Sequence, residues 1–118
     1  MAIVSSHILN ATDGTHAAGV ALRLINLASG AVIAESISDS GGRVMLDIDL
    51  SQADPSDQYE LVFLPRKYFE ESGHDLAYGL DEIVLRFYVP DPNARYHMPV
   101  ILSPHGYSIW KSAPEPIA

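Results

Sequence analysis

The segment from Tyr96 to Ala113, YHMPVILSPHGYSIWKSA, combines the alternation of β-strands with side chains suited to acid–base chemistry. His97 stands two residues before Pro99 in this segment. A histidine has an ordinary pKa of about 6.5, so it can accept or donate a proton near neutral pH. Proline is confined to strand edges and interruptions. We therefore predict an interrupted strand, with His97 facing a cavity instead of a packed sheet.

Two residues far from this segment are further candidates for chemistry. His7 lies in SHILN, which reads as an early strand, and Arg43 follows two glycines at the start of another strand. An imidazole can act as a general base, and a fixed guanidinium can stabilise negative charge in a transition state. From spacing alone, a surface histidine and a solvated arginine at a turn are the more common explanations of these positions. Spacing alone leaves both possibilities open.

Metal and nucleotide chemistry have no recognisable motif in the chain. None of the histidines forms a pair at metal-binding spacing, and there is no cysteine. The histidines are His7, His16, His74, His97 and His105. Neither a GxSxG motif nor a glycine-rich phosphate loop occurs. We expect neither a metal site nor a cofactor.

Composition limits the possible class of protein. The chain has 118 residues, enough for one domain with its own core. Its net charge of −8 argues against nucleic acid or an anionic membrane as a partner. No apolar run approaches the ~20 residues of a membrane span, and the first residues do not resemble a signal peptide. We expect a cytoplasmic protein.

The hydrophobic pattern has a period of two along most of the chain. Residues Arg43 to Leu50, RVMLDIDL, alternate apolar and polar side chains, as a half-buried strand does. Similar short runs are separated by Pro, Gly, Asp and Asn clusters, and the helical candidate is short, from Arg66 to Gly73. The pattern predicts an all-β fold, an antiparallel sandwich of seven to eight strands with one short helix. We expect one domain over residues 1–118, with a frayed tail from about 114 to 118.

Four stretches carry a resemblance to a known family, in that family's order. They are SHILN followed by GTHAAGVALRL, then SDSGGRV, FLPRKYFEESG and YHMPVILSPHGYS. Together they resemble the transthyretin-like family, specifically its 5-hydroxyisourate hydrolases, over almost the whole chain from His7 to Ala113. The resemblance implies a transthyretin-like sandwich and a hydrolase of purine degradation.

The resemblance also implies a set of site residues. The family's catalytic histidines and arginine fall on His7, Arg43 and His97, while a further family histidine is replaced here by Arg95. The family's terminal Tyr-Arg-Gly-Ser falls on residues 110–113, where every residue differs. The implied substrate-binding residues are Ser108, Trp110, Lys111 and Ser112.

Two functions remain open at this point. The first is a hydrolase that opens the cyclic amide of 5-hydroxyisourate or of a substituted, for example N-methylated, analogue. The second is a transthyretin-like small-molecule binding protein that has lost the chemistry. Retention of both histidines and the arginine favours the enzyme, whereas the altered C-terminal motif favours a changed substrate.

The family's assembly is a homotetramer, a dimer of dimers, with sites in the channel between the dimers. By this resemblance one set of hairpin residues supplies apolar contacts between subunits and another set lines the channel. The contact residues are Val100, Ile101 and Leu102, and the channel residues are Tyr107, Ser108 and Trp110.

Overall fold

The chain folds into two β-sheets packed face to face, with one short helix. The computed structural model describes residues 1–75 and 79–117. Within this part of the chain there are nine strands and the helix α1 (Arg66–Glu71). The strands are β1 (Ala2–Asn10), β2 (Ala21–Asn26), β3 (Ala31–Ile37), β4 (Arg43–Ile48), β5 (Gln58–Leu64), β6 (Ile83–Tyr88), β7 (Arg95–His97), β8 (Val100–Ser103) and β9 (Gly106–Ile109).

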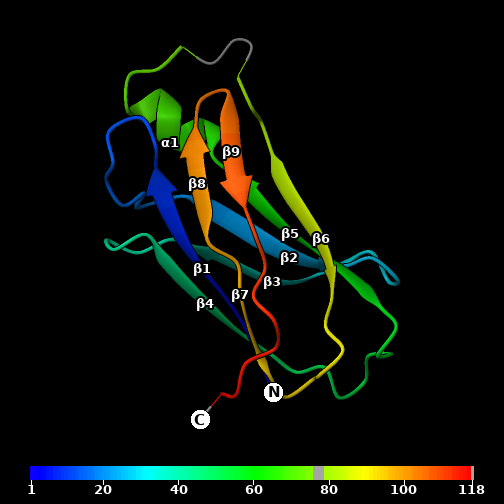
Figure 1. Cartoon of the computed structure of the whole chain (residues 1–118). Helices are drawn as coiled ribbons and strands as arrows, with labels where there is room; N and C mark the ends of the chain where they lie inside the picture. The colour runs from blue at the N-terminus through cyan, green and yellow to red at the C-terminus, as the bar shows by residue number, and fades with distance from the viewer. Residues whose placement is uncertain (76–78, 118) are drawn as a thin grey trace.

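One sheet has five strands in the order β4-β1-β8-β9, and β7 pairs with the first half of β1 (Figure 1). β7 and β8 run parallel to β1, while β4 pairs with it antiparallel. β7 ends at His97 and β8 begins at Val100, so the strand is interrupted around Pro99. The predicted interruption is therefore confirmed, and its physical cause is the missing N–H of proline.

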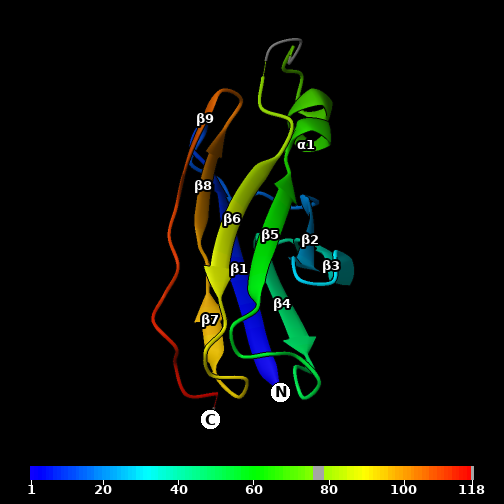
Figure 2. The same cartoon turned by 90° about the vertical axis from the view of Figure 1, so that its right-hand side faces the viewer.

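The other sheet has four antiparallel strands in the order β3-β2-β5-β6. Seen edge-on, β8 and β9 lie on one side of the molecule, and β2, β3 and the helix lie on the other (Figure 2). The core fills the space between the sheets and contains Tyr59, Leu61, Phe63, Tyr96 and Met98, each at most 2% exposed. In β4 the inward residues Val44, Leu46 and Ile48 alternate with exposed ones, as the pattern predicted.

The helix lies at one end of the sandwich, close to the predicted range. It ends at Glu71, and Gly73 follows with a φ of +90°, a conformation that favours glycine after a helix. The Asn10 side-chain amide donates a hydrogen bond to the Tyr68 hydroxyl at 3.0 Å and so ties the end of β1 to this helix. Near the other end, two backbone hydrogen bonds of 2.8 and 2.9 Å join Glu115 to Arg95, so the tail expected to fray is held at this point.

The predicted fold class is confirmed, although residues 1–75 and 79–117 contain nine strands, with β7 and β8 separate. One detail of the predicted hairpin is wrong. Val100 and Leu102 are fully buried in the core, so they provide no contact surface for another subunit, and only Ile101 of the three faces outward. In the described part of the chain, no helix is long and apolar enough to cross a membrane.

Candidate active site

The candidate catalytic residues meet on the side of the five-stranded sheet that is turned away from the core, here called the outer face. Along β1, Ser5 and His7 share this face because alternate residues of a strand point the same way. Arg43 of β4 lies directly opposite His7, and His97 of β7 lies directly opposite Ser5. Two residues of a strand span only about 6.6 Å, so the three predicted catalytic residues gather within one short stretch of sheet.

The turn before β4 places Arg43. The Asp39 carboxylate accepts hydrogen bonds from the backbone N–H groups of Gly41 and Arg43, both at 2.9 Å. These hydrogen bonds lower the pKa of Asp39, so it stays ionised. Gly42 has a φ of +72°, and a Cβ at this position would come within 2.3 Å of the Ile8 carbonyl oxygen. Only glycine lets the turn lie this close to β1, and this contact brings Arg43 beside His7.

A cavity of about 230 Å³ opens on the outer face next to these residues. The groups that line it include Ser5, Asp39, Arg43, Arg95 and His97. Two guanidinium groups therefore border it, against a single carboxylate whose Oδ1 is occupied by the turn. Such a cavity suits a compact polar ligand that develops negative charge.

His97 is held from several sides. Its Nδ1 lies 2.8 Å from the Ser5 Oγ, and Arg95 donates from Nε to the same oxygen at 3.3 Å. The backbone N–H of His97 donates to the Ser112 Oγ at 2.9 Å. Burial, followed by the charge of Arg95, lowers the pKa of His97, while Glu115 opposes the shift. The imidazole is therefore neutral at neutral pH.

His7 has a partner that sequence reasoning did not include in the site. Its Nε2 lies 2.9 Å from the Nδ1 of His16, and the two rings stack with centroids 5.0 Å apart. Burial, Arg43 and then His16 lower the pKa of His7, against a hydrogen bond to the backbone of Gly41 and the charge of Asp39. His16 lies in the loop after β1, where no periodic pattern could have shown its contact with His7.

The structure divides the four C-terminal residues predicted to bind substrate. Ser112 lies beside His97, with backbone and side-chain hydrogen bonds to it. Ser108 lies opposite Ile101 in β9, and Trp110 follows two residues later, 52% exposed. The Lys111 ammonium instead lies 5.2 Å from the centroid of the buried Tyr96 ring. Lys111 is thus directed towards Tyr96, and among the described residues Ser112 is the one of the four that hydrogen-bonds to a predicted catalytic residue.

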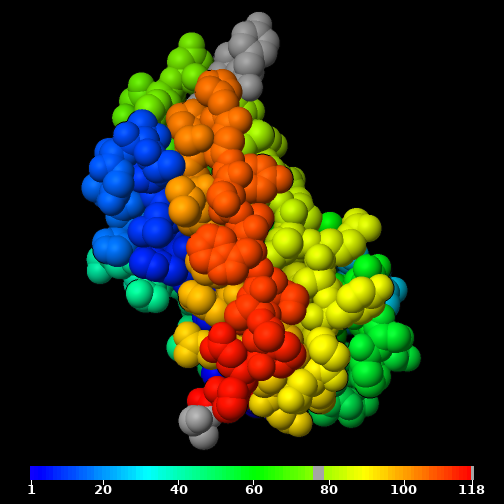
Figure 3. All heavy atoms as spheres, in the orientation of Figure 1, coloured from blue at the N-terminus to red at the C-terminus, as the bar shows by residue number. Residues whose placement is uncertain are grey.

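The space-filling view shows how the C-terminal segment covers this side of the molecule. The orange and red segment lies between the blue strand β1 and the yellow segment that leads into β7 (Figure 3). Its backbone is anchored at Ser112 and again at Glu115. The segment therefore forms one wall next to His97. Within residues 1–75 and 79–117, no three His, Cys, Asp or Glu side chains are grouped to hold a metal ion.

Comparison with known proteins identifies the class. The profile of the HIUase/Transthyretin family matches residues 4–112, which is most of the chain. The chain belongs to this family. The predicted resemblance is therefore confirmed.

Relatives from several bacteria narrow the comparison. A protein of Rhizobium meliloti named 5-hydroxyisourate hydrolase 2 is 32% identical over 115 residues, covering 93% of this chain and 95% of its own length. A 5-hydroxyisourate hydrolase of Halalkalibacterium halodurans is 30% identical, with coverages of 93% and 97%. The prediction that the chain is an enzyme, a hydrolase, is confirmed by these relatives.

Solved structures agree on the fold. The 5-hydroxyisourate hydrolase of Klebsiella pneumoniae aligns with a TM-score of 0.76 at 23% identity, over 94% of this chain and 99% of that one. Sea bream transthyretin in complex with thyroxine aligns with a TM-score of 0.78 at 24% identity, with coverages of 93% and 94%. The same sandwich is therefore found in a hydrolase and in a protein solved with a bound small molecule.

Proposed function

We propose that this protein hydrolyses the cyclic amide of 5-hydroxyisourate or of a substituted analogue of that ring. The observation that carries the proposal is the convergence of two imidazoles and a guanidinium, from His7, His97 and Arg43, on one face beside a 230 Å³ cavity. Relatives at 30% and 32% identity that are named for this reaction support it. The assignment of catalytic roles to His7, His97 and Arg43 is part of the proposal.

The groups in the cavity match what the reaction needs. A water molecule adds to the ring carbonyl carbon and loses a proton to an imidazole, and the carbonyl oxygen becomes an oxyanion. The C–N bond of the ring then breaks, and the departing nitrogen takes a proton, so that a carboxyl group and an opened ring remain. Arg43 stabilises the negative charge on oxygen, and a neutral histidine at neutral pH serves as the base.

The C-terminal wall bears on which ring is preferred. In sequence, Trp110, Ser112 and Ala113 are more apolar, with a different hydroxyl position, than the Tyr-Arg-Gly-Ser motif of the resembled family, and Ser112 is the one that contacts His97. The Ser112 hydroxyl already accepts a hydrogen bond from the backbone of His97. A wall with fewer groups available for hydrogen bonding discriminates less against a substrate with fewer N–H donors. We propose an N-methylated hydroxyisourate as the favoured substrate.

The test generates 5-hydroxyisourate and its N-methylated analogues in situ and follows their spontaneous and protein-dependent decay. We expect decay well above the buffer rate for at least one ring, and faster for the methylated one. Decay no faster than buffer for every analogue would contradict the hydrolase and leave the alternative, a small-molecule binding protein.

Assembly as a homotetramer, a dimer of dimers, is part of this proposal. The exposed apolar side chains Met45, Tyr107 and Trp110 on the five-stranded sheet offer contact area to another subunit. The cavity is below the ~300–1,000 Å³ of drug-sized sites, as expected where a second subunit completes the walls. Light scattering should give about four times the chain mass of 12.8 kDa. A stable monomer at micromolar concentration would contradict the shared site.

A further inference from the structure

His97 has an unusual pair of supporting residues, Ser5 and Arg95. Ser5 is only 3% exposed, and its Oγ has two recorded partners among the described residues, the His97 Nδ1 and the Arg95 Nε. The guanidinium of arginine has donors and no acceptor. Arg95 therefore donates to Ser5, and among the described residues the acceptor within hydrogen-bond reach of the Ser5 hydroxyl is the Nδ1 of His97.

The alternative arrangement leaves a buried hydrogen without a partner. If Nδ1 carried the proton, it would donate to the Ser5 oxygen, which already accepts from Arg95. The Ser5 hydroxyl hydrogen would then lack an acceptor among the described residues, and an unsatisfied buried donor is destabilising. Donation from Arg95 also polarises the hydroxyl and makes it a better donor towards Nδ1. Both effects favour an unprotonated Nδ1.

We propose that Ser5 and Arg95 hold His97 with its ring proton on Nε2, so that His97 is a neutral hydrogen-bond donor to the reacting carbonyl oxygen and His7 is left as the base. Ser5 and Arg95 are positioning residues in this arrangement. The assignment deepens the proposed function and depends on it for its catalytic part. The tautomer itself is a property of the free protein.

The surrounding charges are consistent with a neutral donor. The groups that act on His97 are Arg95 on β7, Arg43 on β4, His7 on β1 and Glu115 on the C-terminal segment. Three of the four disfavour an imidazolium, and burial lowers the pKa of His97 further. Protonation of Nδ1 would also leave the Ser5 hydroxyl hydrogen without an acceptor among the described residues. The site thus opposes a doubly protonated ring both by charge and by hydrogen bonding.

In the reaction the two histidines then have different tasks. Water gives a proton to the Nε2 of His7, which exchanges its contact with the His16 Nδ1 for the water, while the water oxygen bonds to the carbonyl carbon. The oxyanion that forms accepts a hydrogen bond from the Nε2–H of His97 and interacts with Arg43. When the C–N bond breaks, protonated His7 returns its proton to the departing nitrogen, so charge and protons balance.

The test is the ring ¹⁵N spectrum of the protein labelled at histidine, recorded above the pKa of His97, with its signals assigned by loss in His97→Asn. We expect wild-type His97 to carry its proton on Nε2. Ser5→Ala should move the population towards the Nδ1–H form, and Ser5→Thr, which keeps a hydroxyl, should restore it. Ser6→Ala is the matched control for the tautomer, because the Ser6 hydroxyl donates to the Met98 carbonyl at 2.7 Å, whereas the hydroxyl that contacts the His97 ring is that of Ser5.

Kinetics complete the test. Ser5→Ala should lower kcat by at least about tenfold with a small change in KM, because a wrong tautomer harms the transition state more than substrate binding. An Nδ1–H ring in the wild-type protein would overturn the proposal whether or not the ring is hydrolysed. An unchanged kcat in Ser5→Ala would overturn the catalytic role. Failure to hydrolyse any analogue, with His97 as expected, would contradict the proposed function and leave the tautomer assignment intact.

Discussion

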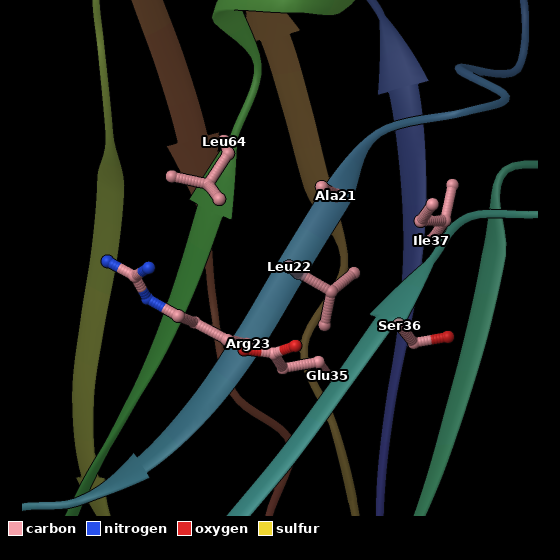
Figure 4. A pocket seen from close by; sticks show the side chains of 7 residues that line it. All are labelled: Ala21, Leu22, Arg23, Glu35, Ser36, Ile37 and Leu64. Carbon is pink, nitrogen blue, oxygen red and sulfur yellow. The ribbon is translucent and has the colours of Figure 1, made fainter. Parts of the chain in front are cut away.

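The two sheets of the sandwich each present a hollow on their solvent side, and the larger one carries less chemistry. The hollow on the four-stranded sheet measures about 400 Å³ and is lined by Ala21, Arg23, Glu35, Ile37 and Leu64, among others (Figure 4). The cavity on the five-stranded sheet is about 230 Å³. Of these two hollows, the larger one is therefore not the one that contains the candidate catalytic residues.

The arginines of the two faces are in different electrostatic surroundings. Arg23 lies opposite Glu35 in the sheet, and its side chain extends away from Ile37, with a guanidinium nitrogen 3.9 Å from Glu82 (Figure 4). Two carboxylates therefore offset one cation. Arg43 and Arg95 instead border one cavity with neutral histidine. Two guanidinium groups against one carboxylate leave an excess of positive charge beside the His97 imidazole, and this excess, not the size of the hollow, distinguishes the candidate active site.

The largest effects should separate the two faces by activity. His7→Asn, Arg43→Ala and His97→Asn should each slow turnover by about 100-fold or more, because they remove a base or a charge-stabilising group. Arg23→Ala, the matched change on the other face, should alter turnover by less than about twofold. The measurement is ring decay with each variant at equal concentration.

Two results would contradict this comparison of the two faces. A loss of activity in Arg23→Ala as large as that in Arg43→Ala, with both proteins folded, would show that charge beside the imidazoles is not what matters. Full activity in Arg43→Ala would remove the guanidinium from the mechanism.

The next effect concerns the turns that build each face. Gly42 and Gly30 both have positive φ, +72° and +74°, but only Gly42 lies against backbone. Gly30→Ala should cost about 1 kcal/mol for the left-handed conformation. Gly42→Ala should cost about 2 kcal/mol more, since the Ile8 carbonyl must move. Urea unfolding of both variants checks this, and equal losses would mean that the turn before β4 is not held tightly against β1.

Local patterns predicted the elements better than the contacts between them. The alternation of β4 and the interruption at Pro99 were readable because strand periodicity and the chemistry of proline act within a few residues. Ser5 and His97, however, lie 92 positions apart. Their hydrogen bond follows from the parallel pairing of β1 with β7, a register that no local pattern specifies.

The orientation of Lys111 was accessible from the sequence but was missed. If the alternation of a strand continued past β9, Lys111 would face the opposite way from Trp110 and Ser112, and its contact with Tyr96 agrees with that direction. The resemblance predicted that Lys111 binds substrate because the family has an arginine at this position. Membership of the family does not determine where a substituted side chain points. Arg95 was noted as a replacement, but its contact with Ser5 required the three-dimensional structure.

A smaller effect should show whether the C-terminal wall tunes the cavity on the five-stranded sheet. Rebuilding the family motif with Trp110→Tyr, Lys111→Arg, Ser112→Gly and Ala113→Ser should shift preference towards the unsubstituted ring. We expect the ratio of kcat/KM for methylated and unmethylated rings to change by at least about threefold. Because Lys111 lies over Tyr96, reverting position 111 alone should change this ratio least. A constant ratio in the rebuilt protein would mean that the wall does not set substrate preference.

The smallest expected effect is a change in the pKa of His97 when the positive charge of Arg95 is removed. The pKa of His97 lies below the ordinary value of 6.5, first because of burial and then because of Arg95. Arg95→Gln removes the positive charge but keeps an amide donor for Ser5, so the pKa of His97 should rise, though burial still holds it down. Arg23→Gln makes the same change of charge on the other face and should leave the pKa of His97 unaltered. Proton NMR titration of the His97 ring in the three proteins measures both pKa values.

The same shift predicts how stability depends on pH. A folded-state pKa of His97 below the unfolded value stabilises the protein above pH 6.5, and this stability is lost as the pH falls through the folded value. Acidification should therefore destabilise wild type and Arg23→Gln alike, and Arg95→Gln less. If the His97 titration is the same in all three proteins, Arg95 does not act on the imidazole by charge, and its role reduces to the hydrogen bond with Ser5.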